Sequence, residues 1–100
     1  MNMLYKPRFS LGQILATPGA LEALKDSGQE PGFFLDMHIR GEWGDLCEGD
    51  RLLNEEALTD GSRIMSSYRT LKGIKLWVIT DAVDEDGKRY VTTILLPEEY

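Results

Sequence analysis

A single histidine and a few charged residues are the side chains of this sequence that could carry out acid–base chemistry. His38 is the sole histidine, and Glu42 follows it four positions later. Arg63 and Arg69 flank a run of strand-forming residues further along the chain. A histidine and a carboxylate can act as general acid and base, and guanidinium groups can clamp a phosphate. If the fold gathers these four residues, they indicate a small metal-independent ribonuclease. If His38 is instead partly buried with satisfied hydrogen bonds, they form no site.

A tryptophan between two glycines is the second candidate feature. It lies in the segment Gly41–Asp45, whose sequence is Gly-Glu-Trp-Gly-Asp. A tryptophan in a connection between helices can pack down into the core. It can also stay exposed as a binding platform, because exposed indoles are enriched where partners dock. In the second interpretation the binding residues are Trp43 with Glu42, Asp45 and Arg63.

Polar residues on one face of the predicted sheet could hold an anion. Arg63, Ser67 and Arg69 alternate along one predicted strand and therefore share a face. Neighbouring strands could add three more residues: Thr80, Arg89 and Thr93. The alternative is a solvated sheet face with ordinary cross-strand pairs.

The sequence does not support metal or cofactor chemistry. The segment Asp84–Gly87 is similar to part of a calcium loop, but the spacing is wrong. With Gly87 at the sixth position, Ala82 falls at the first ligand position and Thr93 at the bidentate glutamate position. We therefore predict a hairpin turn there, and we expect no metal. No phosphate-binding glycine loop or dinucleotide motif is present, so we expect no cofactor.

The single cysteine offers neither a disulfide nor a nucleophile. Cys47 has no partner for an intramolecular disulfide, and no Cys/His cluster exists to bind zinc. It stands among Asp45, Glu48 and Asp50, whose negative charge disfavours a thiolate.

Composition and charge indicate one acidic domain spanning residues 1–100. The chain is 42% hydrophobic, and its 17 acidic residues against 11 basic ones give a net charge of −6. Direct binding of nucleic acid requires clustered lysine and arginine, so we do not expect it. The acidity suits either a solvated surface or one that imitates nucleic acid to occupy a basic protein partner. With no signal-peptide core and no apolar run of about 20 residues, we expect a cytoplasmic protein that does not cross a membrane.

The helix signals precede the strand signals. Thr17 is a good N-cap and Gly28 a good C-terminal glycine, so the spacing predicts a helix over 18–27. A second helix is predicted to begin at Pro31 and end near residue 40. A third, capped by Asp50 and running to residue 60, is expected to turn Leu53 and Ala57 inward.

The last third of the chain alternates with the period of a β-strand. Strands are predicted over 63–70, 74–79 and 91–96, with the middle one central because it is apolar on both faces. Trp77, on that middle strand, is predicted to pack in the core against the helices. The segment 9–16 is either a strand or an ordered lead-in. The predicted fold class is α+β, with two to three N-terminal helices packed on one face of a three- to four-stranded antiparallel meander.

Several segments together resemble a widespread family of bacterial proteins of about a hundred residues, carried on plasmids and integrated elements. The segments are Leu11–Leu24, His38–Asp45, Asn54, Gly61–Tyr68, Leu76–Thr80 and Thr92–Tyr100. Relatives carry labels such as plasmid-related protein or type I restriction modification subunit. The family pattern has an aspartate at the position of Glu42 and a shorter hairpin than Asp81–Arg89. The methyltransferase motifs that the restriction label would require are missing here.

Two functional hypotheses follow. The first is a non-catalytic binding, regulatory or anti-defence accessory protein of mobile-element origin, which engages a larger protein through its acidic helical side or the Trp43 turn. A homodimer is compatible with this hypothesis. The second is a ribonuclease of the barnase or RelE type, whose order of helices followed by antiparallel strands is similar; it would use His38, Glu42, Arg63 and Arg69.

Overall fold

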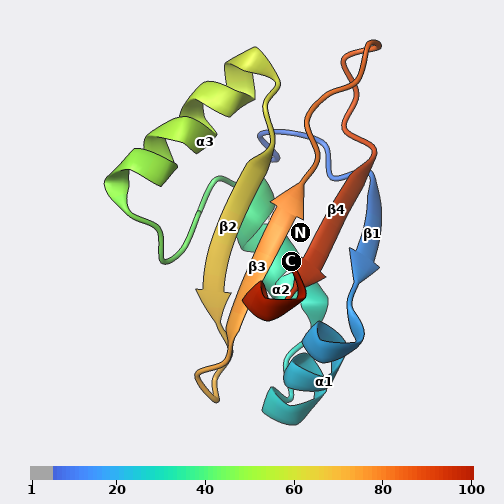
Figure 1. Ribbon diagram of the computed structural model, residues 1–100, viewed down its shortest axis with the longest axis vertical. Helices are drawn as coiled ribbons and strands as arrows, with labels where there is room; N and C mark the ends of the chain where they lie inside the picture. Colours follow the sequence, from blue (N-terminus) through green and yellow to red (C-terminus); the bar gives the residue numbers. More distant parts are fainter. Residues whose placement is uncertain (1–5) are drawn as a thin grey trace.

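The computed structural model describes residues 6–100, which form three helices and a four-stranded sheet (Figure 1). In chain order the elements are β1 (Gln13–Ala16), α1 (Pro18–Ser27), α2 (Pro31–Ile39), α3 (Glu48–Asp60), β2 (Ile64–Arg69), β3 (Lys75–Thr80), β4 (Val91–Leu95) and the short 3₁₀ helix η1 (Pro97–Glu99). The α+β class is therefore confirmed. Within these residues no helix has the length and apolar character needed to span a bilayer.

The sheet is mixed rather than purely antiparallel. Its strand order is β1-β4-β3-β2, and β2, β3 and β4 form the predicted meander with β3 in a central position. β1 exists as a strand but runs parallel to β4, with Gln13 opposite Val91. The expectation of an antiparallel sheet was wrong here. A short apolar run shows that a strand can form, but it does not reveal the direction of a partner far along the chain.

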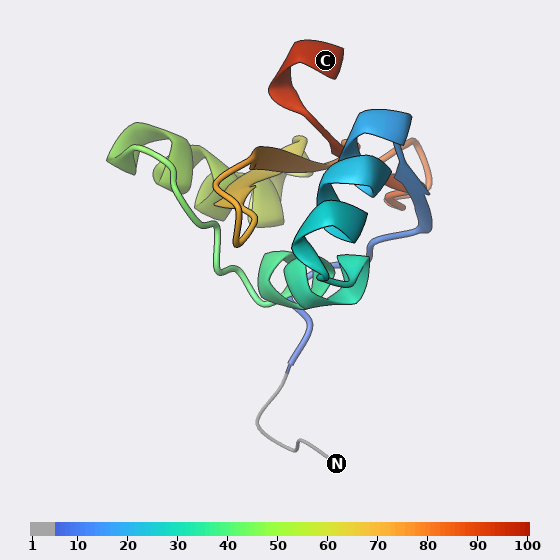
Figure 2. The ribbon, with the colours of Figure 1, turned by 90° about the horizontal axis from the view of Figure 1, so that it is seen from below.

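Two of the helices, not all three, cover one face of the sheet. Figure 2 shows α1 and α2 on one side and the C-terminal η1 on the other, while α3 lies beside the edge strand β2. The main core joins α1 and α2 to the three strands of the meander. Its buried residues are Ala20, Leu24, Phe34, Tyr68, Leu76, Val78 and Ile94.

The caps of α1 were predicted correctly because they are local. The Thr17 hydroxyl accepts a hydrogen bond from the Ala20 N–H at 3.2 Å, and Gly28 closes the helix in the left-handed conformation. α3 begins at Glu48, earlier than predicted, with Cys47 at its N-cap. Asp50 instead lies in the first turn, where a carboxylate still interacts favourably with the helix dipole.

Two predictions of which side chains point inward were wrong. Leu53 on α3 is 62% exposed, because Asn54 and Ala57 face the sheet in its place. Trp77 lies on the face opposite α1 and α2, where its ring meets that of Tyr100 at 5.7 Å. β3 is apolar on both faces, so alternation alone could not assign its sides.

The connection that follows α2 closes the outer edge of β2. The Ser67 N–H donates to the Trp43 carbonyl at 3.0 Å, and the Asp45 N–H donates to the Ser67 carbonyl at 2.7 Å. Gly44 lies between them with a φ of +80°, and a Cβ there would approach the Ser67 carbonyl oxygen to 2.1 Å. The Asn54 side chain continues the pairing with both backbone groups of Met65. These contacts hold the Trp43 turn and α3 against the sheet.

Candidate functional site

His38 is fully buried between α2 and the sheet. Its Nδ1 lies 2.6 Å from the Ser66 hydroxyl, and its Nε2 lies 2.8 Å from the Thr80 hydroxyl. Both hydroxyls come from the strand face that packs against the helices. Ser66 lies two residues after Ile64 and so shares its face, and Ile64 pairs with Thr80 across the sheet. The histidine is therefore part of the core.

The hydrogen bonds around His38 determine which ring nitrogen carries the proton. The Leu11 carbonyl can only accept, so the Thr92 hydroxyl donates to it, at 2.7 Å. Thr92 must then accept the proton of Thr80, whose oxygen lies 2.7 Å away. Thr80 in turn accepts from His38 Nε2–H, and the bare Nδ1 accepts from Ser66. The chain of hydrogen bonds therefore places a proton on Nε2, and because burial disfavours a second proton, Nδ1 carries none.

Burial keeps this ring uncharged over the physiological range. Desolvation lowers the pKa of His38 to about 3, and the nearby Arg89 cation contributes in the same direction. A group that stays neutral and has no contact with solvent is poorly suited to shuttle protons for a substrate.

The structure does not bring together the four residues of the ribonuclease hypothesis. Arg63 lies on the other side of the sheet, where its guanidinium donates to the Tyr100 hydroxyl and stacks on the ring. Arg69, on the same side, donates to the Gly73 carbonyl at 3.2 Å. Glu42 pairs with Arg40 at 3.3 Å. His38 thus shares no cavity with either arginine of the proposed clamp.

The predicted anion constellation is also divided. Ser67 and Thr93 do share the Arg63 face, but Thr80 points to the helices and binds His38. Arg89 is 7% exposed and donates to backbone carbonyls instead of facing the open sheet. Arg89 precedes β4, so strand alternation does not fix its side, and Thr80, within β3, alternates with Leu76 and Val78 on the face that the helices cover.

Trp43 fills the core and does not form an exposed platform. It is 2% exposed, and its ring stacks on Phe9 with centroids 6.2 Å apart and meets the edge of His38 at 6.1 Å. Its Nε1–H donates to a Glu55 carboxylate oxygen at 3.0 Å. Of the binding residues predicted with it, Glu42 and Asp45 are exposed on the same turn, whereas Arg63 belongs to the far face.

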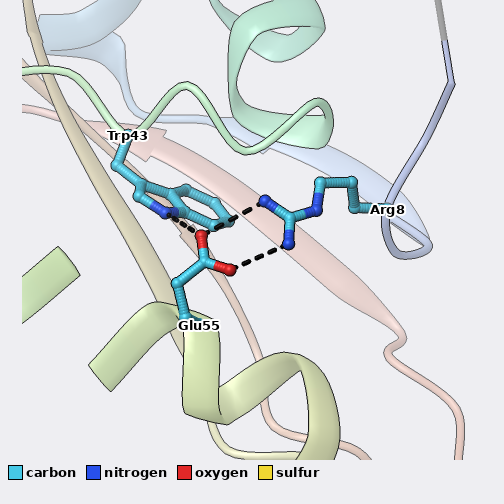
Figure 3. A network of polar contacts seen from close by, with 3 residues as sticks. All are labelled: Arg8, Trp43 and Glu55. Atoms are coloured by element: carbon cyan, nitrogen blue, oxygen red, sulfur yellow. Dashed lines mark hydrogen bonds and ion pairs between the residues drawn. The ribbon is translucent and has the colours of Figure 1, made fainter. Parts of the chain in front are cut away.

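Glu55 also receives the two guanidinium contacts of Arg8, at 2.8 and 3.2 Å (Figure 3). The hydrogen bonds from Arg8 and then Trp43 lower the pKa of the Glu55 carboxyl below its ordinary value. Sequence reasoning did not find this network. Arg8 and Glu55 are distant along the chain, and neither residue belongs to a recognisable motif.

The exposed side of α3 concentrates the negative charge of the molecule. Its thirteen residues contain five carboxylates and a single base, Arg51. The carboxylates are Glu48, Asp50, Glu55, Glu56 and Asp60. Leu52 and Leu53, 56% and 62% exposed, lie among them. Because α3 packs mainly on β2 and stands at the side of the sheet (Figure 1), this acidic and partly apolar surface faces solvent.

No metal-binding group is apparent in the part of the chain that the structure describes. Within residues 6–100, no three histidine, cysteine, aspartate or glutamate side chains gather closely enough to hold an ion. Comparison with known proteins adds no assignment: no family model, curated protein or solved structure matches this chain.

Proposed function

We propose that this chain is a non-catalytic binding protein that occupies a basic surface of a larger protein through the exposed side of α3. The observation that carries the proposal is the charge of α3, five acids against one base, around two exposed leucines. The likeness to plasmid-borne proteins supports a role as a regulatory or anti-defence accessory of a mobile element.

The arrangement of α3 suits recognition of a basic partner. Glu48, Leu52 and Glu56 are spaced four residues apart and form one row along the helix. Exposed carboxylates attract a basic surface over a distance set by salt, and buried leucine adds affinity once the two surfaces meet. A nucleic-acid-binding surface on the partner fits this chemistry, because it already carries clustered lysine and arginine.

The interior of the fold supports binding over catalysis. His38, the side chain best suited to acid–base chemistry, is neutral, fully buried and bonded on both nitrogens. No specific observation favours the ribonuclease alternative.

Charge reversal tests the proposal. The double variant Glu48→Lys/Glu56→Lys changes the row on α3, and Glu22→Lys/Asp26→Lys makes the same change in net charge on the exposed side of α1. Each protein, with wild type, would be used as bait in lysate of its native host. We expect a partner with a basic surface to be retained by wild type and the α1 variant, released by salt, and lost from the α3 variant.

Two outcomes would contradict the proposal. One is the same set of retained proteins for all three baits, which would mean that α3 is not the interface. The other is metal-free cleavage of RNA by purified protein, slowed at least ~100-fold in His38→Ala. The second result would support the ribonuclease instead.

A further inference from the structure

Arg89 is a buried cation that ties three parts of the fold together. One terminal nitrogen, Nη1, donates to the carbonyls of Ser62 at 2.7 Å and Asp81 at 3.0 Å. The other, Nη2, donates to the Ala57 carbonyl in the last turn of α3 at 2.9 Å. With 7% of its surface exposed, the side chain joins the end of α3 and the residues after it to both ends of the connection between β3 and β4.

The guanidinium of Arg89 lies over the Phe9 ring, 5.9 Å from its centroid, and forms no salt bridge with a carboxylate of the described residues. None of the ion pairs among residues 6–100 involves it, and residues 1–5 contain no aspartate or glutamate. A guanidinium has five N–H groups, so two of them, on Nε and Nη2, have no acceptor among the described residues. Asp60 interacts electrostatically with Arg89, but it is exposed and its carboxylate accepts the Ser62 N–H. Buried charges in proteins are normally paired, and Asp60 attracts Arg89 without forming a salt bridge with it. The guanidinium therefore still has capacity for an anionic ligand.

A cleft of about 640 Å³ opens beside this guanidinium. Arg8, Lys88 and Arg89 line it, with Asp60 as its sole carboxylate. Arg8 is neutralised by Glu55, which leaves Lys88 and Arg89 as the cations available to a ligand. Leu58 and Val83 add an apolar wall. The volume lies within the range of small-molecule sites and exceeds what a lone inorganic ion needs.

We propose that this cleft binds a small phosphomonoester, with its phosphate on Arg89 and Lys88 and its organic part against Leu58 and Val83. Two cations suit a dianionic phosphate better than a carboxylate, and a guanidinium with free donors on neighbouring nitrogens suits its oxygens. A nucleic-acid strand fits less well, because its further phosphates would extend beyond the two cations towards carboxylates of α3 such as Glu56.

The test is a titration of the purified full chain at low salt with phenyl phosphate, inorganic phosphate and benzoate. Binding would be followed by calorimetry and by the NMR shifts of the Gly61, Gly87 and Lys88 amides, which line the cleft. We expect saturable binding of phenyl phosphate at or below about 1 mM, with inorganic phosphate and benzoate at least ~10-fold weaker.

The variants locate the site. Lys88→Gln should weaken phenyl phosphate at least ~10-fold, because it removes a charge-assisted contact with the dianion. Lys72→Gln, in the β2–β3 turn, makes the same change in net charge and should leave the affinity unchanged. Arg89→Lys keeps the charge but loses the paired N–H donors of the guanidinium. It should weaken binding, provided that its NMR spectrum shows the variant to be folded.

Several results would overturn the proposal: no saturable binding up to about 10 mM, equal losses in Lys88→Gln and Lys72→Gln, or binding of benzoate or inorganic phosphate as tight as that of phenyl phosphate. None of these results tests the proposed role of α3, because the charge-reversal experiment changes residues of α1 and α3 and leaves Lys88 and Arg89 intact. The two proposals can therefore fail separately.

Discussion

Two polar networks touch the same aromatic cluster, and they differ in how much water reaches them. The cluster consists of Phe9, His38 and Trp43, whose rings lie within 6.2 Å of one another. On the sheet side, His38 enters a chain of hydroxyl groups that is fully buried. On the α3 side, Trp43 donates to Glu55, which holds Arg8 in an ion pair about 40% exposed.

The difference shows how burial decides what a polar residue can do. Every member of the His38 network is neutral, because a charge there would lose its hydration without gaining a counterion. The Glu55 network keeps its charges, because water and an opposite charge both reach them. The first network fixes the packing of α2 on the sheet, whereas the second lies at the margin of the acidic surface to which we assign binding.

The largest effect is expected where the two networks meet. Trp43→Ala removes a fully buried indole and the hydrogen bond to Glu55, so it should lower the free energy of unfolding by about 3–5 kcal/mol. Trp77→Ala, on the half-covered opposite face, should cost at least about 1 kcal/mol less. Urea unfolding of both variants measures the difference. A larger loss for Trp77→Ala would mean that the main core lies on the other face.

The second prediction concerns pH and His38 alone. The pKa of His38 in the folded chain, about 3, lies below the ordinary value of 6.5. Between these two pH values the unfolded chain binds a proton on His38 and the folded chain does not. Stability is therefore fully present above pH 6.5 and falls as the pH decreases towards 3. The slope should be about 1.4 kcal/mol per pH unit between pH 6 and 5, where the carboxylates contribute little.

His38→Gln provides the control, because it keeps a polar side chain but cannot titrate. Its stability should be nearly flat over the same interval. NMR of the wild-type ring should show a neutral Nε2–H imidazole down to pH 4. A ring that titrates near pH 6.5, or that carries its proton on Nδ1, would contradict the hydrogen-bond chain from Leu11 to Ser66.

The sequence could predict the features that depend on neighbours in the chain. The caps of α1, the meander from β2 to β4 and the turn near Gly87 all follow from local patterns, and all are present. The pairing of β1 with β4 and the contact of Arg8 with Glu55 join distant segments, and no local pattern encodes them. Of the candidate site, the sequence indicated the acidity and the Trp43 turn. It did not reveal that His38 and Arg63 lie on opposite sides of the sheet, because alternation gives relative faces but not which face the helices cover.

The smallest effect is expected in the exposed network, and it tests whether α3 is held by packing or by charge. Glu55→Gln removes the ion pair with Arg8 but keeps an acceptor for Trp43, so it should cost about 0.2–1 kcal/mol at low salt. Glu56→Gln makes the same change one position along, where none of the ion pairs among residues 6–100 is lost. It should change stability by less than about 0.5 kcal/mol.

The pKa of Glu55 is lowered in the fold, so its contribution is present above the ordinary carboxyl pKa and lost as the pH falls through the folded value. Salt near 1 M should make the free energies of unfolding of the two variants nearly equal, because it screens the Arg8–Glu55 ion pair. If Glu55→Gln instead costs as much as Trp43→Ala, the ion pair is a main support of α3, and the division between a neutral interior and a charged margin would not hold.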